Sequence, residues 1–235
     1  MQDLATITYA VLLLAHVLLF VYWLGADLAV LYCARYAANP ALSVETRVTV
    51  SEIMGFIDMF PRLSVPLIGA VGLHLAVLGG YVALPRLVVV VAWLLALLWV
   101  ANGLYIYRNR KSPDSTQGAR NFDLWLRVVI ISAATGTAVA GLLGTGHISS
   151  TFIAVKLLVF AAAICLSLIL RHFFKPFRPA LNRIVADTGT SAGSDSDSDS
   201  DSRIMQTTLA RTRPIVFVLW SLTVVAAAVG LWGGG

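Results

Sequence analysis

Leu63 to Tyr107 reads LSVPLIGAVGLHLAVLGGYVALPRLVVVVAWLLALLWVANGLYIY, with apolar side chains at nearly every position. A helix rises about 1.5 Å per residue, so about 20 apolar residues cross the roughly 30 Å hydrocarbon core of a bilayer. The quoted stretch is long enough for two crossings. Leu84, Pro85 and Arg86 interrupt it with a proline and a charge, which are typical of a turn between helices. We therefore expect two adjacent membrane spans here.

The composition of the whole chain agrees with a membrane protein. Of its 235 residues, 58% are hydrophobic and only 12% are charged, and the mean hydropathy is +0.83. Ordinary soluble domains are far more polar. We expect an all-α fold, a polytopic transmembrane helical bundle in which residues 1–235 form one domain. Its six expected spans are 7–33, 60–82, 87–107, 126–143, 152–172 and 214–232.

Lysines and arginines are distributed unevenly among the connections between these spans. The connections after the first, third and fifth spans carry most of them, whereas the two opposite connections contain only Arg86. Cytoplasmic loops of membrane proteins carry an excess of Lys and Arg, so the basic connections should face the cytoplasm. Both termini are then expected outside. This asymmetry also accounts for the formal net charge of +5, which requires no nucleic-acid partner.

One segment of the last basic connection differs from the rest of the chain. Residues 188–202 read TGTSAGSDSDSDSDS and contain no apolar side chain larger than alanine. Such a composition cannot bury enough surface to offset the entropy lost on ordering, so we expect a disordered cytoplasmic loop. Residues 173–185, just before it, alternate large apolar with basic side chains, which favours a helix lying at the membrane interface.

Two histidines, His16 and His74, lie within the first and second apolar spans. Each is about nine residues from the outer end of its span, or roughly 13 Å below the outer surface. Ionisable side chains are costly in hydrocarbon and usually face the protein interior. Because consecutive helices are usually neighbours, we expect the two imidazoles to face each other and hold a metal ion or a haem iron. The alternative is that each hydrogen-bonds a neighbouring helix.

Other side chains gather near the two histidines. Lys156 enters the fifth span from the same outer side, and His147 lies in the connection before it. Trp23 follows His16 at a seven-residue spacing, which keeps both on one face of the first helix. Because no Met or Cys lies near this level, the ligand set suits haem better than Cu(I). A haem would be bound non-covalently, since the chain has no CxxCH motif.

Two stretches have patterns shared with bacterial membrane proteins. HVLLFVYWLG, from His16 to Gly25, resembles the H-x6-W-x-G opening helix of the HemJ family and of CopD-type copper-resistance proteins. AVKLL, from Ala154 to Leu158, and the residues that follow as far as Phe177 are similar to the lysine-bearing helix of HemJ. HemJ proteins have four helices, so relative to them this chain would carry its third and fourth spans as an insertion.

The HemJ resemblance implies an activity and a set of site residues. HemJ proteins contain haem b and oxidise protoporphyrinogen IX, and a histidine and a lysine in these two helices are important for their function. For this chain the resemblance implies that His16 binds haem b and that Lys156 is the catalytic side chain. We add His74 as a second metal ligand and Trp23 as part of the cofactor site. The expected function is electron transfer or porphyrin oxidation in the bacterial inner (plasma) membrane, with a redox partner or a quinone.

Two other functions remain open at this point. A CopD-like protein would use the same histidines to move copper or a small solute across the lipid bilayer, without enzymatic activity. A structural membrane subunit would bind no ligand at all. The sequence contains no nucleotide-binding glycine loop, nucleophile elbow or HExxH motif, so any enzymatic reaction would depend on a cofactor. Whether the chain is an enzyme, and how many copies assemble, is left open.

Overall fold

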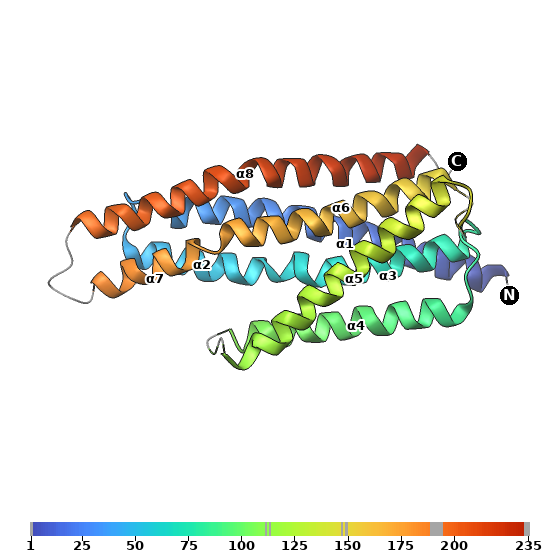
Figure 1. Cartoon of the computed structure of the whole chain (residues 1–235), viewed down its shortest axis with the longest axis horizontal. Coiled ribbons are helices and arrows are strands. Elements are labelled where there is room, and N and C mark those ends of the chain that lie inside the picture. Colours follow the sequence, from blue (N-terminus) through green and yellow to red (C-terminus); the bar gives the residue numbers. More distant parts are fainter. Residues whose placement is uncertain are drawn as a thin grey trace. The chain divides into compact units, whose positions relative to one another are not determined.

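The protein is built from α-helices (Figure 1). A computed structural model describes residues 2–110, 112, 114–146, 148, 150–188 and 195–232. Its elements are α1 (Gln2–Ala37), α2 (Val44–Ile57), α3 (Met59–Leu78), α4 (Arg86–Arg108), a 3-10 turn (Asp114–Thr116), α5 (Gln117–Leu142), α6 (Thr151–Phe174), α7 (Phe177–Thr188) and α8 (Asp195–Trp232).

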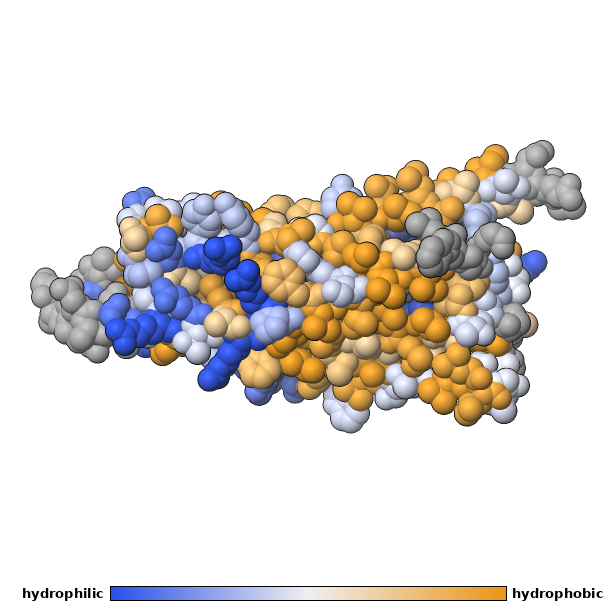
Figure 2. Space-filling view, turned by 90° about the horizontal axis from the view of Figure 1, so that it is seen from above, coloured by the Kyte–Doolittle hydropathy of each residue, from blue (hydrophilic) through white to orange (hydrophobic). Residues whose placement is uncertain are grey.

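Six helical segments of the described chain are long and apolar enough to cross a membrane. They are Leu4–Ala37, Val44–Leu78, Arg86–Arg108, Gln117–Leu142, Thr151–Asp187 and Asp199–Gly230. Large apolar side chains remain exposed on them, including Leu87 at 71% and Leu94 at 61%, and a broad apolar surface is visible in Figure 2. Such a surface is suited to lipid and not to water. The prediction of an all-α, polytopic membrane protein with six spans is confirmed.

The chain divides into two compact units, and the first contains most of the apolar helices. It comprises Met1–Leu24, Met59–Cys165 and Leu222–Gly235. Within it α3 packs against α4, and α4 against α5. Gly80 and Gly144 follow the ends of α3 and α5 with φ values of 73° and 72°, a conformation that glycine adopts without steric cost and that commonly ends helices. The loops that follow them are joined by an antiparallel bridge between Val82 and Ile148.

The second unit comprises Gly25–Asp58 and Leu166–Ser221. Here α2 packs against α7. Ser43 caps α2 by accepting a hydrogen bond from the Thr46 backbone N–H at 3.3 Å. Arg47 on α2 is only 2% exposed and donates from Nε to the Ala37 carbonyl at 2.8 Å. Because Ala37 is the last residue of α1, this bond satisfies a carbonyl that the helix itself leaves without a partner.

Two predictions for this unit are corrected by the structure. From Asp195 to Ser202 the expected disordered loop is instead the start of α8, where Asp201 is 5% exposed and accepts hydrogen bonds from Arg183. Residues 189–194 of that loop lie outside the described residues. The expected interfacial helix at 173–185 is also different, because the apolar side chains of α7 are buried in the core of the unit: Phe177, Leu181 and Ile184 are at most 4% exposed.

Candidate functional site

The His16 imidazole lies against α3 in the first unit. A Cβ atom added to Gly72 would lie 3.1 Å from His16 Cε1, so the ring occupies the space that a larger residue at position 72 would need. The backbone of Ile68 also lies close to the ring. Ile68 and Gly72 are one helical turn apart on α3 and therefore lie on the same face. The glycine thus makes room for the imidazole beside the helix backbone.

One nitrogen of this imidazole is buried without a partner. Nδ1 of His16 makes no hydrogen bond within the described structure. A buried polar atom without a partner costs about 1–3 kcal/mol, so it calls for an explanation. Histidines that bind metals commonly use one ring nitrogen as the ligand, while the other is held by a backbone carbonyl or a carboxylate. The unpartnered Nδ1 of His16 fits the first of these two roles.

Lys156 on α6 lies close enough to His16 for the two charges to interact. Its ammonium is 5.5 Å from the centre of the Phe152 ring, a cation–π distance. A Cβ atom added to Gly230 on α8 would lie 2.9 Å from Lys156 Cε. In the described residues no carboxylate pairs with this ammonium. We call His16, Ile68, Gly72, Phe152, Lys156 and Gly230 the His16 site.

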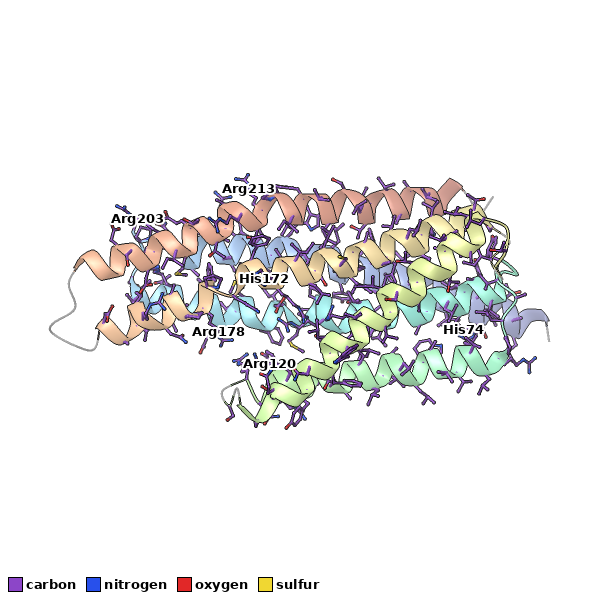
Figure 3. The ribbon with its side chains drawn as sticks, viewed as in Figure 1. His74, Arg120, His172, Arg178, Arg203 and Arg213 are labelled. Carbon is purple, nitrogen blue, oxygen red and sulfur yellow. The ribbon has the colours of Figure 1, made fainter. Side chains whose placement is uncertain are left out.

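His74 lies on a different side of α3. Its Nδ1 accepts a hydrogen bond at 3.3 Å from the indole N–H of Trp93 on α4, and Figure 3 shows His74 on the side of α3 that faces α4. Residues 72 and 74 are about 200° apart around a helix. The two imidazoles therefore do not face a common space, and the expected arrangement of His16 opposite His74 is not formed. The contact of His74 with Trp93 is the interhelical hydrogen bond that we considered as the alternative.

The remaining predicted residues are placed as follows. Trp23 is 6% exposed and lies about two turns beyond His16 along α1. His147 lies outside the described residues. The structure therefore brings together His16 and Lys156, buries Trp23 on the same helix as His16, and separates His74 from them. The assignment of these residues to metal or cofactor binding stays a prediction.

A buried polar cluster on α4 and α5 was missed by the sequence analysis. Asp123 accepts a hydrogen bond from Trp99 Nε1 at 2.7 Å and another from Arg127 Nε at 3.0 Å. The guanidinium of Arg127 lies 5.0 Å from the centre of the Trp99 ring. The signal was present, because opposite charges four residues apart meet on one helix face. Since each charge has its partner within the cluster, we assign it to joining α4 with α5.

Comparisons with known proteins do not assign a function to this chain. No protein-family model, curated protein or solved structure matches this chain. The resemblance of the His16 and Lys156 helices to HemJ and CopD proteins is therefore neither strengthened nor weakened. What the described structure adds is geometric: a half-buried lysine beside a half-buried imidazole whose buried Nδ1 has no partner.

Proposed function

We propose that this chain is an integral membrane protein that binds a b-type haem through His16 and acts in porphyrin oxidation or electron transfer. The observation that carries the proposal is the buried Nδ1 of His16, which has no hydrogen-bond partner among the described residues, on a ring close enough to Lys156 for the two charges to interact. The same two residues were selected by the resemblance to HemJ. Their proximity in the first unit supports the view that they serve one site.

The ligand set favours haem over a bare metal ion. A porphyrin supplies four nitrogen ligands of its own, so the protein needs to provide only one or two. A bare copper or zinc ion needs three or four protein ligands. Among the described residues, no group of three or more His, Cys, Asp or Glu side chains is close enough to hold a metal ion. His16 alone therefore suits a haem with one protein ligand, and we omit His74 from the ligand set.

The other residues of the site have roles that follow from their chemistry. A bound haem would supply the redox chemistry, because the protein side chains here have none of their own. Lys156 presents a positive charge that can pair with a porphyrin propionate, or donate and accept a proton at its Nζ atom. Gly72 leaves room for the imidazole beside α3, and Phe152 makes a cation–π contact with the Lys156 ammonium. Trp23 contributes a buried aromatic surface on the same helix as His16.

The setting of this activity is also part of the proposal. The six spans make the chain a multi-pass membrane protein, and the distribution of Lys and Arg supports an orientation with both termini outside. Together with the resemblance to bacterial proteins, this suggests the bacterial inner membrane. Electrons would be passed to a redox partner or a quinone in the bilayer.

A spectroscopic comparison of two histidine variants tests the proposal. The purified full-length protein should show a Soret band that shifts on reduction, with sub-stoichiometric copper by elemental analysis. His16→Ala should abolish the band, whereas the control His74→Ala should retain it, because His74 bonds to Trp93 on another side of α3. Both variants remove one imidazole from an apolar span, so they are matched in chemistry.

Other outcomes of this experiment would contradict the proposal. A haem that survives in His16→Ala, or one that is lost equally in both variants, would overturn the ligand assignment. A colourless protein that carries stoichiometric copper would favour the CopD-like transport function. A protein that binds neither, although it is expressed in cells supplied with both, would support the structural subunit.

A further inference from the structure

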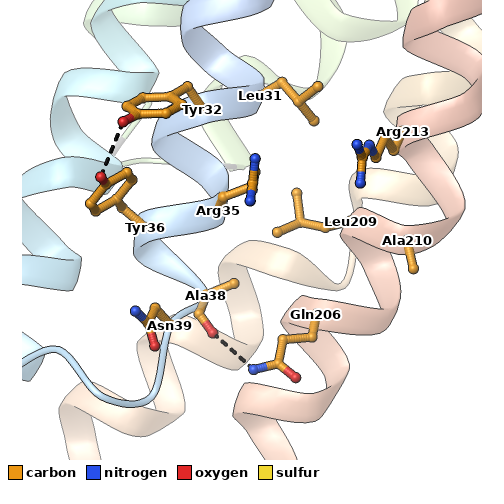
Figure 4. Close-up of a pocket in the computed structure, with 10 residues that line it drawn as sticks. All are labelled: Leu31, Tyr32, Arg35, Tyr36, Ala38, Asn39, Gln206, Leu209, Ala210 and Arg213. Carbon is orange, nitrogen blue, oxygen red and sulfur yellow. Dashed lines mark hydrogen bonds between the residues drawn. The ribbon is translucent and has the colours of Figure 1, made fainter.

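A pocket in the second unit lies between the end of α1 and the middle of α8 (Figure 4). Its volume is about 610 Å³. Two arginines line it, Arg35 from α1 and Arg213 from α8, and Figure 4 shows both guanidinium groups directed into the same space. All residues that line this pocket belong to the second unit, whereas the His16 site belongs to the first. The proposed haem function therefore does not use the pocket.

The two arginines are available to an anionic ligand. Two other arginines of the unit have acidic partners: Arg183 pairs with Asp201 and Arg203 with Asp199. In the described residues neither Arg35 nor Arg213 pairs with a carboxylate. Like charges that face one pocket repel each other, and an anion between them removes that repulsion.

The rest of the lining is partly apolar. Leu31 and Leu209 lie beside the arginines (Figure 4), while Gln206 donates to the Ala38 carbonyl at 3.4 Å. Tyr32 also lines the pocket, and its hydroxyl lies 3.1 Å from that of Tyr36. A pocket with positive charge and a leucine-lined wall fits a ligand that has both an anionic group and hydrocarbon. A free inorganic anion would make no apolar contact with Leu31 and Leu209.

The position of the arginines along the chain points to the membrane boundary. Arg35 follows the expected first span, 7–33, by two residues, and Arg213 immediately precedes the expected last span, 214–232. Both therefore lie where a span meets the headgroup region, on the side that carries most Lys and Arg. Arginine and tyrosine are common at this level, where lipid phosphates are found.

We propose that this pocket binds the phosphate of an anionic phospholipid from the leaflet on the cytoplasmic side. Guanidinium groups bind phosphate through paired N–H donors, and two of them facing one pocket can contact its oxygens from both sides. The acyl chains would lie along Leu31 and Leu209. A soluble phosphate compound could use the same two arginines, and only the lipid would use the leucines as well.

Native mass spectrometry of the full-length protein in detergent tests the proposal. Phosphatidylglycerol is added in steps, with phosphatidylcholine as the neutral comparison, and bound lipid is counted for each protein. Each basic side chain at a membrane surface contributes about 1 kcal/mol to binding an anionic lipid, so Arg35→Gln with Arg213→Gln should weaken binding of the first phosphatidylglycerol about 30-fold. Phosphatidylcholine binding should not change.

A second double variant provides the matched control. Arg178→Gln with Arg211→Gln removes the same charge from exposed arginines of the same unit that do not line the pocket, and it should retain phosphatidylglycerol binding. Arg35→Lys with Arg213→Lys should recover part of the affinity, which shows that the pocket is folded. Equal loss in both glutamine variants, or equal binding of the two lipids by the wild type, would overturn the proposal.

Glycerol 3-phosphate distinguishes the two sources of phosphate. Because it lacks acyl chains, it should not displace phosphatidylglycerol at equal concentration. Displacement at equal concentration would show that the pocket serves a soluble phosphate compound and would overturn the lipid assignment. The result is independent of haem binding, since the wild type and all variants can be compared whether or not a Soret band is present.

Discussion

Removing the Asp123 carboxylate should strongly destabilise the protein. In the wild type, this side chain accepts from Trp99 on α4 and from Arg127 on its own helix. The Arg127 side chain is only 4% exposed, so Asp123→Ala would leave its charge buried without the carboxylate. Breaking a buried ion pair by removing one partner costs about 3–5 kcal/mol, and we expect a loss of this size in the free energy of unfolding.

The loss can be measured by unfolding the protein with increasing SDS in mixed micelles, followed by far-UV circular dichroism. A double variant, Asp123→Leu with Arg127→Met, should recover most of the lost stability, because no buried charge then remains. Asp199→Ala serves as the control, since its pair with Arg203 is exposed and should contribute less than about 1 kcal/mol. The reasoning is wrong if Asp123→Ala costs less than about 1 kcal/mol, or if the double variant is as unstable as the single one.

Three further predictions concern the two units. Gly72→Val should displace the His16 ring and lower the haem content, as measured by the Soret absorbance per protein; Gly136→Val, with open space around its Cβ position, should retain it. Arg47→Met should lower the free energy of unfolding by about 1–3 kcal/mol, since the Ala37 carbonyl loses its buried donor; an equal effect of Arg178→Met would contradict this. Lys156→Ala should keep the Soret band but slow oxidation of protoporphyrinogen about 100-fold if Lys156 transfers a proton; unchanged turnover would remove it from the catalytic role.

The sequence predicted the spans because a single property, long apolar segments, determines them. Each expected span lies largely within an observed helix of suitable length. It did not predict α2, whose residues mix Glu45 and Arg47 with apolar side chains. Arg47 is buried because it reaches the end of α1 and Ser202 of α8, and such distant contacts leave no local pattern. The helical start of α8 likewise depends on a contact between residues distant in sequence, the ion pair of Asp201 with Arg183.

For the candidate site, the sequence identified the residues but not their directions. Their places along the spans put His16 and His74 at a similar level, yet the side of α3 that each one meets depends on how the helices are rotated. That rotation follows from packing, with a glycine at position 72 against His16 and an indole at position 93 against His74. Neither contact could be read from the spacing of the histidines. The proximity of Lys156 to His16 was suggested by depth alone and is present in the structure.

The most direct test of the central claim is chemical rescue of the His16 ligand. His16→Gly removes the imidazole and leaves a space of its size beside Gly72, which added imidazole can fill. The reduced-minus-oxidised absorbance spectrum should show a haem signal in the wild type, none in purified His16→Gly, and a restored signal when this variant is loaded with haem in the presence of imidazole. A wild-type haem signal in His16→Gly without imidazole would contradict the claim that His16 holds the iron.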